Sequence, residues 1–229
     1  MSNPSTLGHW LRRFLAEHIV TERNLARNTQ KSYRDTFALL LPFVRARTRK
    51  PVERLALHDL TAQHVRQFLD HLESDRACSV QTRNQRLSAI RSFARFVASR
   101  DPVQIEWSAS IRAIASKKAA PQPIGWLSKT EVNDLLEVPD RRTPRGRIEH
   151  ALLLFLYNTG ARVSEAARLV AGDLQIGRRD GGHALVNIHG KGGKQRQCPL
   201  WARTESVLGN LVRGRAPGDA VFLSRRQRP

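Results

Sequence analysis

Residues 152–169 read LLLFLYNTGARVSEAARL, and this stretch decides the fold of the C-terminal half of the chain. The apolar run predicts a helix over residues 147–158 that lies at the centre of a core. The pair Thr159-Gly160 predicts a turn, and residues 163–169 predict a short second amphipathic helix. Arg162 stands at the joint between these helices, where a small turn residue would be easier to accommodate.

Arg162 has the chemistry of a phosphate ligand. A turn before a helix leaves backbone N–H groups free at the helix start, and such groups bind anions. A guanidinium beside them adds a forked cation that matches a phosphate. Glu165, one helical turn later, is placed to hold the guanidinium or to cap the helix. Two other interpretations stay open here: a surface ion pair between Arg162 and Glu165, and a helix-turn-helix DNA reader, which the strongly apolar first helix fits less well.

A β-hairpin follows this helix pair. Residues 184–188 alternate between apolar and polar side chains as in a strand, HGKGGK at 189–194 makes a glycine turn, and QRQCPL at 195–200 returns. Lys191 at the tip can reach a phosphate or protonate an oxygen leaving group. A solvated turn is the plain alternative. The motif is not a nucleotide-binding P-loop, because Gly192 follows the lysine where that loop has Ser or Thr.

Apolar residues at helical spacing predict the other elements. In the first hundred residues they predict a compact four-helix domain, with helices over residues 7–18, 33–44 (bent or ended by Pro42), 62–72 (after an N-cap at Thr61) and 79–99. Ser128 and Glu131 form a capping box that begins a helix in the second half. A last helix is predicted around residues 207–212.

The charge of the chain points to a polyanion as partner. Lys and Arg total 39 against 20 Asp and Glu, which gives a net charge of +19. Residues 1–120 carry +11 of this charge and residues 121–229 carry +8, so either half has the charge to face the same partner. Nucleic acid is the commonest polyanion that binds soluble proteins. A merely basic surface is the alternative.

Nothing in the sequence indicates a membrane. The longest apolar run, ALLLFLY at 151–157, is far too short to span a bilayer. The N-terminus becomes charged before an apolar run develops, so no signal peptide is expected. We expect a cytoplasmic protein.

The order and spacing of these motifs are similar to those of the tyrosine recombinase (phage integrase) family. The resemblance is carried by TGARVSE at 159–165, GKGGK at 190–194 and the Pro-Leu strand end at 199–200, and it runs collinearly from about residue 5 to the end. Three further stretches support it: LSKTEVNDLL at 127–136, NLARNTQKSYRDTFALL at 24–40 and TRNQRLSAIRSFARFV at 82–97.

The resemblance implies a mainly α fold in two domains. It implies a four-helix core-binding (SAM-like) domain over residues 1–104 and a partial α+β catalytic domain with a small β-hairpin over 126–229. The prolines, small residues and lysine pair of the stretch between them predict a linker over 105–125, with room for one short helical turn. The implied function is that of a DNA-binding site-specific recombinase or integrase. The implied partners are double-stranded DNA and other copies of the chain on that DNA.

Family chemistry joins a tyrosine to the 3′ phosphate of the broken strand, with no metal and no external energy source. No cofactor is therefore expected. By the resemblance, Arg162 is the first phosphate-binding arginine, Glu165 is the acidic residue that supports it, and Lys191 is the hairpin lysine that acts as general acid on the 5′ oxygen.

DNA-binding residues are predicted less directly, since an ordinary solvated basic face has the same sequence pattern. The candidates lie near the second helix, on the fourth helix and beside Lys191: Thr29, Lys31, Arg34, Arg83, Arg86, Arg91, Arg95, Lys194 and Arg196.

The family pattern continues with His-x-x-Arg, a His or Trp, and the nucleophilic tyrosine, and none of these follows Lys191. The tyrosines present, Tyr33 and Tyr157, are interpreted as packing residues, and HWLR at 9–12 as a chance match in the first helix. The resemblance therefore predicts a C-terminally truncated member that binds DNA but does not cleave it alone. The alternatives are a non-catalytic DNA-binding regulator and a decayed integrase fragment.

Overall fold

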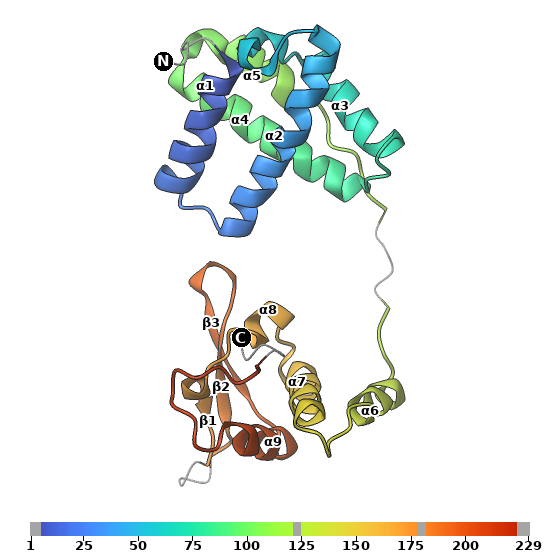
Figure 1. The fold of residues 1–229 in the computed structure, drawn as a ribbon, viewed down its shortest axis with the longest axis vertical. Helices are drawn as coiled ribbons and strands as arrows, with labels where there is room; N and C mark the ends of the chain where they lie inside the picture. Colours follow the sequence, from blue (N-terminus) through green and yellow to red (C-terminus); the bar gives the residue numbers. More distant parts are fainter. Residues whose placement is uncertain (1–5, 121–124, 178–181, 224–229) are drawn as a thin grey trace. The chain divides into compact units, whose positions relative to one another are not determined.

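The computed structural model describes residues 6–120, 125–177 and 182–223. Contacts between residues divide the chain into two units, Met1–Gln122 and Pro123–Pro229 (Figure 1). Each unit has its own hydrophobic core. The architecture is mainly helical with one small sheet, as the sequence predicts.

The first unit is built from helices. A π-helical segment continues the first helix, and three 3₁₀ turns connect the longer helices. The elements are α1 (Leu7–Arg12), η1 (Arg13–Glu22), α2 (Arg27–Thr48), η2 (Val52–Arg54), η3 (Leu57–Asp59), α3 (Ala62–Ser74), α4 (Val80–Arg100), η4 (Pro102–Gln104) and α5 (Ile105–Arg112).

An aromatic cluster forms the centre of this unit. The ring of Phe14 lies 6.0 Å from that of Phe37 and 5.4 Å from those of Phe93 and Phe96. Fully burying one such side chain stabilises the fold by about 1.5–3 kcal/mol. The predicted inward face of α4 is confirmed, because the side chains of Leu87, Ile90, Ala94 and Val97 are all buried.

The helix ends follow from local chemistry. Thr61 caps α3 as predicted, since its hydroxyl accepts the N–H of His64 at 3.1 Å. The expectation that Pro42 bends or ends the second helix is corrected in one respect, because α2 continues past it to Thr48. Proline removes only one backbone donor, and the buried face of α2 carries the helix through this position. The helix ends where Arg49 adopts a left-handed conformation with φ 55°.

The predicted linker over residues 105–125 begins too early. Residues 105–112 form α5, which packs on α4, and Ile111 and Ile114 are buried in the core of the first unit. The indole N–H of Trp107 donates to the carbonyl oxygen of Leu60 at 2.8 Å. The segment is short and rich in small residues, so its period is a weak signal, and tertiary packing decides its conformation.

The second unit combines helices with a three-stranded sheet. Its elements are α6 (Lys129–Glu137), α7 (Pro144–Thr159), α8 (Val163–Ala166), η5 (Ala171–Asp173), β1 (Leu174–Gln175), β2 (Leu185–His189), η6 (Lys191–Gly193), β3 (Gln195–Pro199) and α9 (Ala202–Val212). The predicted capping box of α6 is present, because the N–H of Ser128 donates to Glu131 Oε2 at 2.7 Å and the N–H of Glu131 donates to Ser128 Oγ at 3.3 Å.

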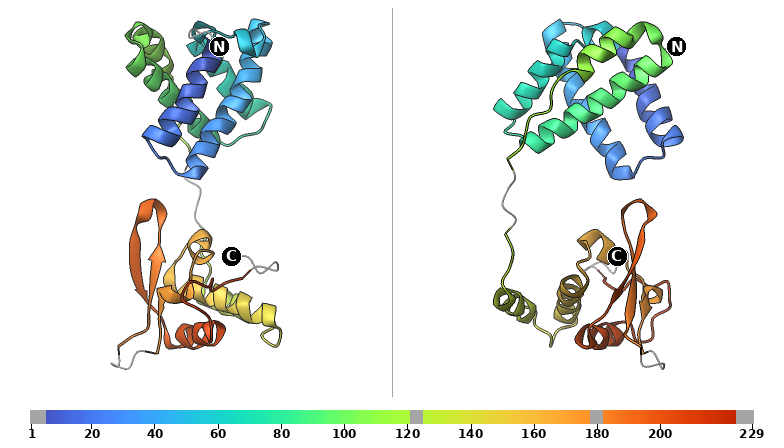
Figure 2. Two further views of the ribbon diagram at one scale, coloured as in Figure 1. Left: turned by 60° about the vertical axis from the view of Figure 1, so that its left-hand side comes forward. Right: turned by 180° about the vertical axis from the view of Figure 1, so that it is seen from behind.

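The sheet is antiparallel with the order β1-β2-β3. Ile188 of β2 is paired with Arg196 of β3, and Val186 is paired with Cys198. Directly opposite residues of an antiparallel pair project from the same face. Because Val186 and Ile188 are buried, Arg196 lies on the core-facing side of the hairpin. The hairpin extends beyond α7 and α9 (Figure 2).

The apolar run at residues 151–157, within α7, forms the centre of the second core. Phe155 of α7 is fully buried, and its ring lies 5.7 Å from that of Phe222. At the end of α7, the side-chain amide of Asn158 donates to the carbonyl of Pro199 at 3.2 Å and accepts the N–H of Trp201 at 2.9 Å. These bonds fasten the helix to the junction between β3 and α9.

None of the helices in the described part of the chain combines the length and the apolar composition that a bilayer span requires.

Candidate functional site

Arg162 lies at the joint that the sequence predicts. Gly160 ends α7 in the left-handed region with φ 60°, and Arg162 is the N-cap of α8. The guanidinium Nη1 of Arg162 donates to Glu165 Oε1 at 2.9 Å. The side chain of Arg162 remains 72% exposed, while that of Glu165 is 1% exposed. A buried carboxylate therefore orients a guanidinium that is open to solvent.

Glu165 has a second cationic partner, which the sequence did not reveal. Arg196 Nη2 donates to Glu165 Oε2 at 2.9 Å, and the backbone N–H of Arg162 donates to the same oxygen at 3.0 Å. The bonds from Arg196 and from the Arg162 backbone lower the pKa of Glu165 to about 2, although burial of the carboxyl opposes this shift. The carboxylate in turn raises the pKa of Arg196. Glu165 is thus ionised at neutral pH.

The hairpin closes over this carboxylate. Gly190 lies so near it that an added Cβ would be 3.5 Å from Glu165 Oε1 and 3.3 Å from the carbonyl oxygen of Lys194. The turn is fastened by the N–H of Gly190, which donates to that carbonyl at 2.6 Å. The backbone of Lys191 begins η6 at the tip, and its side chain lies outside the described part of the structure. Lys194 is exposed beside it.

The predicted role of the helix start is corrected. The second helix is a single turn, Val163–Ala166, in place of the predicted residues 163–169. The first N–H group that the turn presents, that of Arg162, is taken by Glu165. The backbone N–H of Arg162 is therefore not free to bind an anion. One turn is also too short for the recognition helix of a helix-turn-helix reader, which lies along the major groove.

Both tyrosines are packing residues, as the sequence suggests. Tyr33 stacks on Phe14 with ring centroids 5.9 Å apart and lies against the first core. Tyr157 packs edge-on against Trp201 at 5.3 Å. The HWLR motif lies in α1, where Trp10 and Leu11 are buried.

The structure places Arg83, predicted to contact DNA, inside the first unit. Its side chain is 6% exposed, and Nη1 donates to Asn84 Oδ1 at 3.0 Å and to the carbonyl of Ala115 at 3.1 Å. Its Nε also lies 3.8 Å from Glu73 Oε2. These contacts fasten the segment after α5 to α4, so Arg83 is not available to DNA.

Arg86 and Arg91 are also engaged within the first unit. Arg86 Nη1 donates to the carbonyl of Ser32 at 3.0 Å and to Thr36 Oγ1 at 3.1 Å, which joins α4 to α2. Arg91 donates to the carbonyl of Ile114 and to Ser116 Oγ. Both arginines add to the positive charge of the unit, but the N–H groups named here are used in hydrogen bonds within the unit. The sequence could not distinguish these arginines from solvated ones, because their partners lie up to 54 residues away.

The remaining candidates of the first unit lie at its surface. Lys31, Arg34 and Arg95 are exposed and Thr29 is half-buried. Arg34 and Lys31 line a shallow pocket of about 280 Å³ at the start of α2. Their role toward DNA stays a prediction.

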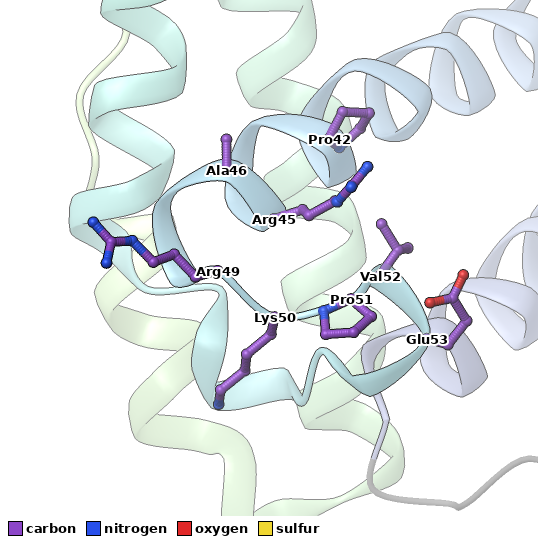
Figure 3. A pocket seen from close by; sticks show the side chains of 8 residues that line it. All are labelled: Pro42, Arg45, Ala46, Arg49, Lys50, Pro51, Val52 and Glu53. Carbon is purple, nitrogen blue, oxygen red and sulfur yellow. The ribbon is translucent and has the colours of Figure 1, made fainter.

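A larger basic pocket of about 660 Å³ lies at the other end of α2, lined in part by Arg45, Arg49 and Lys50. Figure 3 shows that these three cationic ends point in different directions. Lys50 is bound to Asp59, with 2.7 Å between Nζ and Oδ1. The carbonyl end of a helix also disfavours an anion. This pocket is therefore not part of the candidate site.

Comparison with known proteins supports the same interpretation for both units. Residues 125–229 match the model of the phage integrase family, and residues 9–103 match that of the phage integrase N-terminal SAM-like domain.

Curated relatives cover most of the chain. An integrase/recombinase of Sinorhizobium fredii, y4rD, is 40% identical over 87% of this chain and 70% of its own length. The tyrosine recombinase XerC of Roseiflexus castenholzii is 31% identical over 91% of this chain and 65% of its own length. The chain thus spans about two thirds of the length of these relatives.

Solved structures share the fold at low sequence identity. A lambda integrase dimer bound to a COC′ core site matches 98% of this chain and 75% of its own, with a TM-score of 0.67 and 16% identity. The XerH recombinase bound to its difH substrate matches 100% of this chain and 75% of its own, with a TM-score of 0.62 and 19% identity. The two matched family models and the 40% identical relative from Sinorhizobium fredii show that the chain belongs to the phage integrase family of tyrosine recombinases.

Proposed function

We propose that this chain binds double-stranded DNA as a site-specific recombinase or integrase and that Arg162 contacts the phosphate at which strand exchange takes place. The observation that carries this proposal is the pairing of an exposed guanidinium with a buried, ionised carboxylate. A guanidinium oriented in advance loses less freedom when it binds a phosphate bidentately.

Each member of the site then has a role. Arg162 holds the non-bridging oxygens of the phosphate, where charge develops in the transition state of transfer. Glu165 orients the guanidinium. Lys191 at the hairpin tip protonates the 5′ oxygen, a role that rests on the family motif alone. Lys194, exposed on the same tip, is placed to contact the DNA backbone.

We propose further that the 229 residues do not cleave DNA by themselves. Tyr33 and Tyr157 belong to separate units, and each is engaged in aromatic packing. No other tyrosine is present in the sequence. The N-terminal unit acts as a core-binding domain, and residues 126–229 act as part of a catalytic domain. Both contribute to DNA binding, and the protein acts in the cytoplasm.

The test has two parts. Binding to a short DNA duplex is measured against salt for the wild type, Arg162→Ala and the matched control Arg168→Ala, whose exposed arginine lies just after α8. Arg162→Ala should weaken binding about tenfold and lower the salt slope by about 0.9, while the control changes little. Equal binding by wild type and Arg162→Ala would overturn the phosphate assignment.

The second part uses a suicide DNA substrate that traps covalent intermediates. The expected result is a retained complex that denaturant dissociates. A covalent adduct between protein and DNA would contradict the proposal that the 229 residues do not cleave DNA by themselves. Binding without preference for recombination-site DNA would favour a general DNA-binding regulator.

Assembly on DNA is proposed on a separate ground. The lambda integrase structures are described as a dimer on a core site and a tetramer on a Holliday junction. Cross-linking of this chain with and without DNA tests whether it associates in the same way. Monomers alone under both conditions would contradict the proposal.

A further inference from the structure

We propose that Arg196 is a positioning residue that offsets the negative charge of Glu165, so that the group around Arg162 stays positive toward its ligand, and that it does so without touching DNA. This inference rests on the proposed phosphate-binding role of Arg162. It reassigns Arg196, which the sequence pattern alone places among the DNA contacts.

The register of the hairpin determines which way Arg196 points. Arg196 is paired with Ile188, so it projects from the face of the sheet that covers the core. Its neighbours in β3, Gln195 and Gln197, project from the opposite face and are exposed. The half-exposed guanidinium of Arg196 is stabilised on this face by a charge-assisted hydrogen bond to an anion. Glu165 is that anion.

Arg162 and Arg196 share the carboxylate of Glu165. Glu165 gives Oε1 to Arg162 at 2.9 Å and Oε2 to Arg196 at 2.9 Å, so each guanidinium has its own oxygen. The backbone N–H of Arg162 occupies the remaining side of Oε2 at 3.0 Å. The carboxylate is 1% exposed, and Gly190 lies beside it, where an added Cβ would be in contact with Oε1 at 3.5 Å.

The charges of Arg162, Glu165 and Arg196 do not cancel. Alone with Glu165, Arg162 would belong to a neutral pair and would attract a phosphate weakly. With Arg196 bound to the same carboxylate, the group of three carries a net charge of +1. Of the two arginine side chains, that of Arg162 is 72% exposed and that of Arg196 is 39% exposed. The surplus charge is therefore presented mainly by Arg162.

The arrangement also joins two parts of the site. Arg162 lies at the end of α7, whereas Arg196 lies in the strand that leaves the hairpin tip. The single carboxylate between them fixes the start of β3, next to the hairpin tip, relative to the guanidinium of Arg162. Lys191 is five residues before Arg196 on that hairpin.

A double-mutant cycle tests the proposal, with affinity for a short DNA duplex as the readout. Arg196→Gln should weaken binding by about three- to tenfold in the wild-type background. In the Arg162→Ala background the same change should have an effect of less than about twofold, because the residue through which Arg196 acts is gone. Arg162 is exposed, so its replacement leaves the fold intact.

A rescue experiment separates this role from a direct contact between Arg196 and DNA. Glu165→Gln removes the negative charge, so Arg162 no longer needs a second cation. Arg196→Gln should therefore cost little affinity in the Glu165→Gln background. A residue that bound DNA directly would lose affinity in this background as well. Circular dichroism checks the fold of each variant, and the cycle with Arg162→Ala decides if Glu165→Gln does not fold.

Two matched controls complete the design. Lys194→Gln changes the same hairpin by the same charge at an exposed position, and its effect should add to that of Arg162→Ala. Arg213→Gln, exposed at the end of α9, should change affinity little. If the effects of Arg196→Gln and Arg162→Ala add, Arg196 contacts DNA itself and the inference is wrong. If Arg162→Ala alone has no effect, the proposed function fails instead.

Discussion

Asp173 and His189 join the end of β2, next to the hairpin tip, to the turn before β1, with 2.9 Å between Asp173 Oδ1 and His189 Nε2. The other oxygen of Asp173 accepts the N–H of Val170 at 3.1 Å and so caps η5. The carboxylate of Asp173 thus holds the turn before β1 and the end of β2 together. The sequence did not single out either residue, because the pair is separated by 16 positions.

This pair gives a graded prediction for stability. Asp173→Ala removes the cap and the bond to histidine and should lower the free energy of unfolding by about 1–3 kcal/mol. His189→Ala removes only the second bond and should cost about 0.5–1.5 kcal/mol. Urea denaturation of the full chain measures both. A larger loss for His189→Ala than for Asp173→Ala would contradict the assignment of the cap.

The helix that replaces the predicted linker gives a second prediction. Ile111 is fully buried and Ile105 on the same helix is 59% exposed. Ile111→Ala should lower the free energy of unfolding by about 2–5 kcal/mol through the lost burial and the cavity left behind. The matched control, Ile105→Ala, should stay within about 0.5 kcal/mol of the wild type. Similar effects of the two changes would show that α5 does not belong to the core.

The arginines of the first unit separate into two classes. Arg83→Ala should lower the free energy of unfolding by about 1–3 kcal/mol, because it breaks bonds to Asn84 and Ala115 inside the unit. Arg34→Ala, at an exposed position, should leave stability unchanged and lower the salt slope of DNA binding by about 0.9. Thermal unfolding and a salt titration measure the two quantities. A changed slope for folded Arg83→Ala would restore that residue to the DNA interface.

The acidity of Glu165 predicts a dependence on pH. Its pKa in the folded chain is about 2, below its ordinary value of 4.5, so the unfolded state binds the proton more readily. The stabilisation from its ion pairs is complete above that ordinary value and is lost as the pH falls through about 2. The advantage of the wild type over Glu165→Gln in urea midpoint should therefore shrink on acidification. A constant advantage over the acidic range would contradict it.

Much of the fold follows from local sequence. The apolar face of α4, the cap at Thr61 and the capping box of Ser128 and Glu131 depend on residues within a few positions of one another. The same holds for the turn at Gly160 and the ion pair between Arg162 and Glu165, which are three residues apart. Such features depend on helical geometry alone, so periodicity and motif spacing were sufficient to predict them.

Other features depended on residues that the sequence keeps far apart. Glu165 and Arg196 are 31 positions apart, and Arg83 and Ala115 are 32 apart. An arginine in a basic sequence looks the same whether it meets solvent, DNA or a buried carboxylate.

By itself, then, the sequence determined the family, the order of the helices and hairpin, and the candidate residues Arg162, Glu165 and Lys191. Only the tertiary structure decided that Arg196 turns inward to Glu165, that Arg83 is buried, and that α5 belongs to the first core. The physical reason is that strand register and helix packing bring charges together across long loops, and neither quantity is encoded in any short stretch of the chain.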